Sequence, residues 1–215
     1  MAIIASDTGG RDFKKVPPGC HFAICNMVVD LGIQETTFKG QSKSQHQVYL
    51  RWEVPDERVT YEKDGKEHEG PCSIGASYTL SLSEKANLRK LLENWRGVPF
   101  SEQELKGFDI TTVAGKCCQV MVQHKTAGGK TYANITGVMG VSKDQKERAR
   151  QAKSEVGVVV YSLDEPNAEM EQKLPNWIRD KLASRVAAPS LHTANAQAPA
   201  GEDFDDDIPF NREAA

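Results

Sequence analysis

The chain has 215 residues, enough for one medium-sized domain with a tail or at most two small domains. Its formal net charge is -3, its mean hydropathy is -0.53, and 27% of its residues are charged. No apolar run approaches the ~20 residues that a membrane-spanning helix needs, and the N-terminal residues lack the basic start of a secretory signal. These features exclude a helical membrane protein and predict a cytoplasmic one.

Charge is distributed unevenly. Five acidic residues fall between Glu202 and Asp207, which leaves residues 1–200 with a balance of +2. Residues 116–153 hold eight basic and two acidic residues, a balance of +6. A basic segment and an acidic tail on one chain indicate a polyanionic partner and a second, basic partner. The alternative interpretation is a solvated helix and a solubilising tail.

The chain has five cysteines, an odd number, and no C-x-x-C motif, which indicates reduced thiols in a cytosol. Cys20, His21, Cys25 and Cys72 could in principle hold zinc, but their spacing fits no common zinc motif. The sequence also lacks a P-loop, a G-x-S-x-G motif and an H-E-x-x-H motif. We therefore predict no enzyme, no metal and no cofactor.

The first half of the chain is predicted to form an arm and three strands. Residues 1–15 form a flexible arm, and the strands lie at roughly 21–31, 47–54 and 74–80. A polar loop is expected over 36–45, and Asp64-Gly65 indicates a hairpin turn before the third strand. Alternation along the second strand places Trp52 in the core and Tyr49 with Arg51 on the surface, with an edge-of-core tyrosine as the alternative.

After the third strand the apolar spacing changes to that of a helix. Apolar residues recur at i, i+3, i+4 and i+7, which predicts an amphipathic helix whose buried face carries Leu88, Leu91, Leu92 and Trp95. Ser83 is the expected N-cap, and Gly97 is expected to end the helix.

A final hairpin is predicted from strands at 116–125 and 131–138 around Gly128-Gly129. A two-residue turn pairs Ala127 with Lys130, so that apolar residues face apolar ones and polar residues face polar ones. Val122 then faces Ile135, and His124 faces Ala133. The solvent face of the hairpin carries Gln119, Gln123, Lys125, Lys130, Tyr132 and Asn134.

The remaining chain adds an extension and a tail. Residues 142–154 favour a helix, residues 157–161 a strand, and residues 175–185 a short helix with Trp177, Ile178 and Leu182 on one side. Residues 16–185 are therefore expected to form one domain, followed by a disordered linker and acidic tip over 186–215. Three strands, a helix and a hairpin predict a mainly β, five-stranded, OB-fold-like antiparallel barrel, with a β-sandwich as the alternative.

Basic and aromatic residues on the exposed faces of these strands favour single-strand binding, because Lys and Arg follow phosphates and aromatic rings stack on bases. Amide side chains can contact phosphate, sugar or base edges without fixing the sequence. The candidate contacts are Phe38, Lys39, Lys43, Tyr49, Arg51, Gln119, Gln123, Lys125, Lys130, Tyr132 and Asn134.

Residues 203–210, Asp203-Phe204-Asp205-Asp206-Asp207-Ile208-Pro209-Phe210, resemble the acidic tip of the bacterial single-stranded DNA-binding proteins. In that family an OB-fold is joined by a flexible linker to this tip, which recruits replication, recombination and repair proteins. The resemblance implies that the last three residues fill an apolar pocket on a partner while the aspartates meet its basic rim. Five residues follow Phe210 here, so this chain departs from the family, in which that phenylalanine carries the terminal carboxylate.

The rest of the chain resembles single-stranded DNA-binding and recombination-associated proteins of bacteriophages. The similar segments are Pro-Pro-Gly-x-x-x-Ala-x at 17–24, Gly-Lys-Cys-Cys-Gln-Val-Met-Val at 115–122 and Gly-Lys-Thr-Tyr-Ala-Asn-Ile at 129–135. The expected function is sequence-tolerant coating of single-stranded DNA in the cytoplasm of a host bacterium. A strand-annealing protein or recombination mediator is one alternative, and an adaptor that uses the tip without binding DNA is another.

Overall fold

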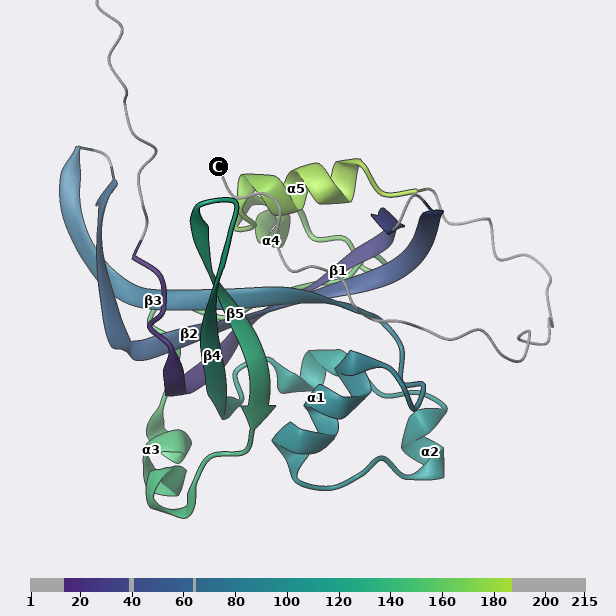
Figure 1. Cartoon of the computed structure of the whole chain (residues 1–215), viewed down its shortest axis with the longest axis horizontal. Coiled ribbons are helices and arrows are strands. Elements are labelled where there is room, and N and C mark those ends of the chain that lie inside the picture. The colour runs from purple at the N-terminus through teal and green to yellow at the C-terminus, as the bar shows by residue number, and fades with distance from the viewer. Residues whose placement is uncertain (1–13, 39–40, 64, 187–215) are drawn as a thin grey trace, which may run out of the picture.

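The computed structural model describes residues 14–38, 41–63 and 65–186. Its five long strands form one antiparallel sheet in the order β3-β2-β1-β4-β5, curled into a half-barrel (Figure 1). The strands are β1 (Gly19–Phe38), β2 (Gln41–Lys63), β3 (Lys66–Thr79), β4 (Cys117–Ala127) and β5 (Lys130–Met139). This order, with a helix after the third strand, confirms the mainly β, OB-fold-like class that the sequence predicts.

The prediction of a polar loop over 36–45 is wrong. β1 continues to Phe38 and β2 begins at Gln41, and the two strands pair from Ile33 with His46 to Phe38 with Gln41. A two-stranded ribbon needs no apolar alternation, because its backbone groups bond to each other across the pair.

β2 also continues through Pro55, where the sequence predicts its end. The proline lies where the pairing of β2 with β3 shifts, between Val54 and Arg58, so its missing N–H breaks no regular ladder bond. Beyond this point Lys63 pairs with Lys66, which confirms the hairpin predicted between β2 and β3.

The inner face of the half-barrel is closed by α1 (Asn87–Arg96). Its four predicted core residues are buried, and the Trp95 ring lies 6.1 Å from that of Trp52 on β2. Gly97, with φ of 73°, ends the helix as predicted. Ser83 is not the N-cap, because the helix begins three residues later than expected, after Ala86, which is buried and offers no capping side chain.

Two short elements that the sequence reading missed connect α1 to β4. α2 (Glu102–Leu105) begins with a capping box, in which Ser101 and Glu104 bond to each other's backbone N–H groups. η1 (Ile110–Val113) is capped by Asp109. The Ser-x-x-Glu spacing at 101–104 is the sequence signal that could have predicted α2.

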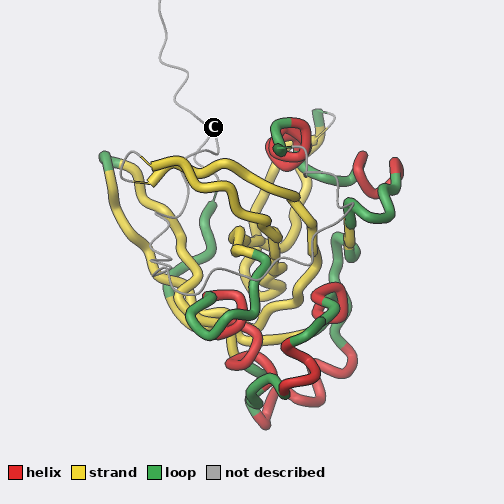
Figure 2. Tube along the Cα trace, turned by 90° about the vertical axis from the view of Figure 1, so that its right-hand side faces the viewer, coloured by secondary structure: helices red, strands yellow, loops and turns green. Residues whose placement is uncertain are grey.

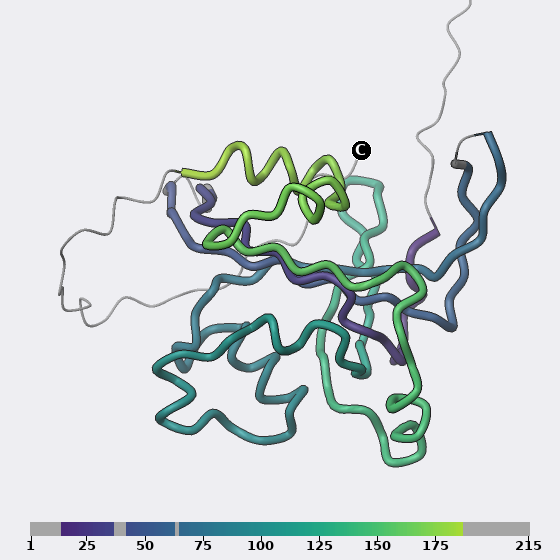
Figure 3. The backbone as a smooth tube through the Cα atoms, turned by 180° about the vertical axis from the view of Figure 1, so that it is seen from behind, coloured from purple at the N-terminus to yellow at the C-terminus, as the bar shows by residue number. Residues whose placement is uncertain are grey.

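The outer face of β1 and β2 is covered by the C-terminal extension, so the sheet has helices on both sides (Figures 1 and 2). The extension contains η2 (Lys143–Gln145), α3 (Lys146–Gln151), β6 (Val159–Tyr161), α4 (Ala168–Gln172) and α5 (Asn176–Ala183). Figure 3 shows it running across the back of the sheet from α3 to α5. The helix, strand and helix predicted after residue 141 are confirmed.

A second apolar core holds this extension in place. Met27, Val29 and Leu31 on β1 are buried under Ile178 and Leu182 of α5. β6 pairs in parallel with β1 over residues 27–29, on the edge of β1 that β4 occupies over residues 19–24. The extension is therefore an integral layer of the domain.

A buried carboxylate strengthens this attachment. Glu53 on β2 is fully buried and accepts hydrogen bonds from the backbone N–H of Glu155 at 3.0 Å and from the Ser154 hydroxyl. Asn26, at a shift in the pairing of β1 with β2, lies 3.4 Å from the same carboxylate. A buried carboxyl group is tolerated when such donors surround it.

Gly75 on β3 is required by close packing. A Cβ at this position would lie 2.1 Å from the Tyr49 hydroxyl oxygen and 2.9 Å from the Leu50 carbonyl oxygen. We expect Gly75→Ala to lower the free energy of unfolding by about 1–3 kcal/mol, since Tyr49 must move within a packed layer. Urea denaturation measures this, with Gly107→Ala as the control because a Cβ there meets nothing within 4 Å. Equal stability of the two variants would contradict the prediction.

Candidate nucleic-acid interface

The β4–β5 hairpin has the register that the sequence predicts. Val122 pairs with Ile135, Gln123 with Asn134, and the turn lies between Ala127 and Lys130. Gly128 and Gly129 have φ of 57° and 77°, a backbone that suits a two-residue hairpin turn and favours glycine. A shift between Met121 and Val122 lets Thr136 donate to the Met121 carbonyl.

One face of this hairpin points away from the core, and we call it the β4–β5 strip. Its basic residues, Lys125 and Lys130, are exposed near the turn, and Tyr132 is half-buried opposite Lys125. Met121 and Met139 add exposed apolar surface, at 37% and 36% of their areas. The complete strip consists of Gln119, Met121, Gln123, Lys125, Lys130, Tyr132, Asn134 and Met139.

At its other end the strip adjoins η2 and α3. The Gln119 side chain donates to that of Gln145 in η2 at 3.2 Å, and the Cys117 thiol lies 3.5 Å from the Ala149 carbonyl oxygen in α3. These contacts hold η2 and α3 beside the start of β4. Nearby side chains exposed to solvent include Lys143, Lys146, Arg150 and Lys153.

The Arg148 side chain is held by contacts within the protein. Its guanidinium makes two hydrogen bonds to Asp56, at 2.8 and 2.6 Å, and lies 4.2 Å from the centre of the Phe22 ring. The hydrogen bonds from Arg148 lower the pKa of Asp56. Arg148 therefore positions α3 and is a poor candidate for a phosphate contact.

The predicted surface position of Tyr49 and Arg51 is wrong. Tyr49 is buried beneath α5, and its ring lies 4.9 Å from that of Trp177 in an edge-to-face contact. Arg51 is partly buried and donates a hydrogen bond to the Asn26 side chain at 3.0 Å. Burial lowers the pKa of Arg51, and the nearby Tyr49 and Glu53 raise it by a smaller amount. The outer face of β1 and β2 is covered here, so neither side chain joins the β4–β5 strip.

Burial raises the pKa of Tyr49 to about 12. Its protonated form thus stabilises the fold fully below pH 10, and this contribution is lost as the pH rises towards 12. We expect alkali to lower the free energy of unfolding less in Tyr49→Phe than in the wild type. Urea denaturation at pH 9 and at about pH 11 tests this. Tyr61→Phe is the control because Tyr61 is exposed, and equal alkaline losses in all three proteins would contradict the prediction.

The other predicted contacts are separate from the strip. Phe38 ends β1 and Lys43 is exposed on β2, so both belong to the β1–β2 hairpin. Lys39 and the acidic tip over 203–210 lie outside the described residues. Gln119, Gln123, Lys125, Lys130, Tyr132 and Asn134 come together on one face as predicted, and the sequence reading missed Met121 and Met139.

Among residues 14–38, 41–63 and 65–186, no three His, Cys, Asp or Glu side chains gather closely enough to hold a metal ion, so Cys20, His21, Cys25 and Cys72 form no such site. No helix in these same ranges is long and apolar enough to cross a bilayer. Comparison with protein-family models and with curated proteins finds no match.

Proposed function

We propose that the chain binds single-stranded DNA without sequence preference through the β4–β5 strip and the adjoining basic residues of η2 and α3. The observation that supports this most directly is the alignment of exposed Lys125 and Lys130 and half-buried Tyr132 with three amide side chains on one hairpin face. Lysines can follow the phosphates, the amides can contact sugar and base edges, and Tyr132 offers a ring for stacking. Outer-face contacts through Tyr49 and Arg51 are not part of this proposal.

The acidic tip completes the proposal. Residues 203–210 would recruit replication, recombination and repair proteins of a host bacterium to the coated strand, through apolar contacts of Ile208 and Phe210 and the charges of the aspartates. In this proposal the chain is phage-encoded and acts in the host cytoplasm. It needs no cofactor.

Fluorescence anisotropy of a labelled oligo-dT tests DNA binding directly, using the full-length chain at two salt concentrations with unlabelled duplex as competitor. We expect salt-sensitive binding that duplex does not displace, with a slope that reports the number of phosphates contacted. Absence of binding at low salt would reject the proposal. Annealing of complementary strands in the same conditions would favour a strand-annealing protein instead.

An adaptor that binds no DNA is the second candidate function. It is favoured by the scarcity of rings for base stacking, since Tyr132 is the one aromatic residue among the eight that form the strip. Deleting residues 203–207 separates the two functions. A DNA-coating protein should bind oligo-dT as well as before or better, since the deletion removes four acidic charges. An adaptor should bind no oligo-dT and should lose its binding of a host partner, its only activity, on the same deletion.

A further inference from the structure

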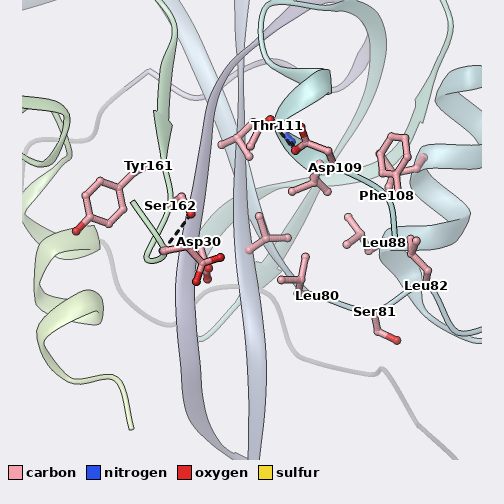
Figure 4. Close-up of a pocket in the computed structure, with 15 residues that line it drawn as sticks. Asp30, Leu80, Ser81, Leu82, Leu88, Phe108, Asp109, Thr111, Tyr161 and Ser162 are labelled. Atoms are coloured by element: carbon pink, nitrogen blue, oxygen red, sulfur yellow. Dashed lines mark hydrogen bonds between the residues drawn. The ribbon is translucent and has the colours of Figure 1, made fainter. Parts of the chain in front are cut away.

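A cavity of about 310 Å³ lies between the inner face of β1 and β2, α1, η1 and the residues after β6 (Figure 4). Leu80 lines this cavity and leaves 38% of its surface exposed. A cavity of this size and character can take an apolar side chain. The apolar walls are formed by Val28, Val48, Leu80, Leu82, Leu88, Leu92, Phe108 and Ile110.

Carboxylates are placed around this apolar space. Asp30, Asp109 and Asp164 are among the lining residues, which all belong to the described part of the chain and include no lysine or arginine. Asp30 lies 2.6 Å from the His46 ring nitrogen, and Asp109 accepts from the Thr111 backbone N–H at 2.9 Å. These contacts fix two of the carboxylates, and Asp164 is exposed to solvent.

An apolar cavity with acidic residues around it selects its occupant by charge. It repels nucleic-acid phosphates, and it also repels the acidic segment from Glu202 to Asp207 of this chain. A ligand that combines an apolar group with positive charge gains from both the walls and the carboxylates.

We propose that this cavity docks a short segment of a partner protein in which an apolar side chain is flanked by lysine or arginine. The cavity shares no residue with the β4–β5 strip. A partner could therefore be held while the strip contacts DNA, and the proposal stands whether or not the chain binds single strands.

The test uses the full-length chain and a fluorescein-labelled peptide with two central leucines between pairs of arginines. One control peptide replaces the leucines with serine, and another replaces the arginines with glutamate. We expect the first peptide to bind and both controls to bind at least about fivefold more weakly.

Two variants locate the binding site. Leu80→Asn removes exposed apolar wall and Asp164→Lys reverses one carboxylate, and each should weaken binding of the leucine–arginine peptide by about fivefold. Asp180→Lys on α5 is the matched control, because Asp180 is also exposed but does not line the cavity. Circular dichroism checks that all three variants fold. Oligo-dT binding of Leu80→Asn, which changes no charge, should equal that of the wild type, which keeps this test separate from that of the proposed function.

Equal binding of the serine peptide would show charge attraction alone and overturn the proposal, as would unchanged binding in both cavity variants. Self-association of the wild type that Leu80→Asn abolishes in sedimentation would place a second copy in the cavity and would also overturn it. Protection of the backbone amides of residues 80–82 and 108–111 from hydrogen exchange by the peptide would support it.

Discussion

Replacing both Lys125 and Lys130 with glutamate should weaken binding of the chain to oligo-dT by about one hundredfold at low salt. Each lysine is exposed at the turn end of the β4–β5 strip, where a phosphate can approach both. The change removes two positive charges and adds two negative ones. The salt dependence should become shallower by about 1.4 in log–log slope, since each single-strand phosphate contact contributes about 0.7. Anisotropy titrations across a salt series measure both effects.

A matched pair of exposed lysines elsewhere controls for net charge. Lys66 lies on β3 and Lys90 on α1, and neither belongs to the strip. The double variant Lys66→Glu, Lys90→Glu changes the charge of the chain by the same amount. If it weakens binding as much as the strip variant does, binding follows overall charge and the strip is not the interface.

Glu53→Ala should lower the free energy of unfolding by about 3 kcal/mol, because it leaves buried donors without their acceptor. The Glu155 backbone N–H, the Ser154 hydroxyl and the Asn26 amide all point to this carboxylate. The loss should begin in the C-terminal extension. Urea denaturation measures the total effect, and hydrogen exchange of residues 154–162 should increase before that of β4.

Glu67→Ala is the matched control, since Glu67 also lies in a strand of the sheet but is exposed. It should change stability by less than about 0.5 kcal/mol. Glu53→Gln should fall between the two, because its amide keeps one acceptor oxygen but places an N–H group among donors. Equal stability of the alanine variants at positions 53 and 67 would show that the buried carboxylate does not hold the extension.

Local patterns predicted the β4–β5 hairpin well. Its register follows from a two-residue Gly-Gly turn and from alternation that places Val122 opposite Ile135, and both signals lie within a few residues of each other. The same holds for α1, whose stripe from Leu88 to Trp95 needs no information from the rest of the chain.

The environment of Tyr49 could not be predicted in this way. Alternation correctly separates it from Trp52, but it does not say what covers the second face of β2. That cover comes from Trp177 and its neighbours, more than a hundred residues further along the chain. The prediction of a loop at the polar ends of β1 and β2 failed for a different reason, because exposed strands and exposed loops have similar compositions.

The division of one edge of β1 between β4 and β6 has a consequence for synthesis of the chain. Met27 and Val29 leave the ribosome about 130 residues before Val159 and Tyr161, the β6 residues that pair with them, and longer still before Ile178 and Leu182 of α5, which cover them. At roughly 5–20 residues per second, this delay lasts about 7–26 s. During that time an apolar strand face and part of its edge are open to other chains. Slower elongation after β5 would lengthen this exposure, whereas faster synthesis of residues 140–182 would shorten it.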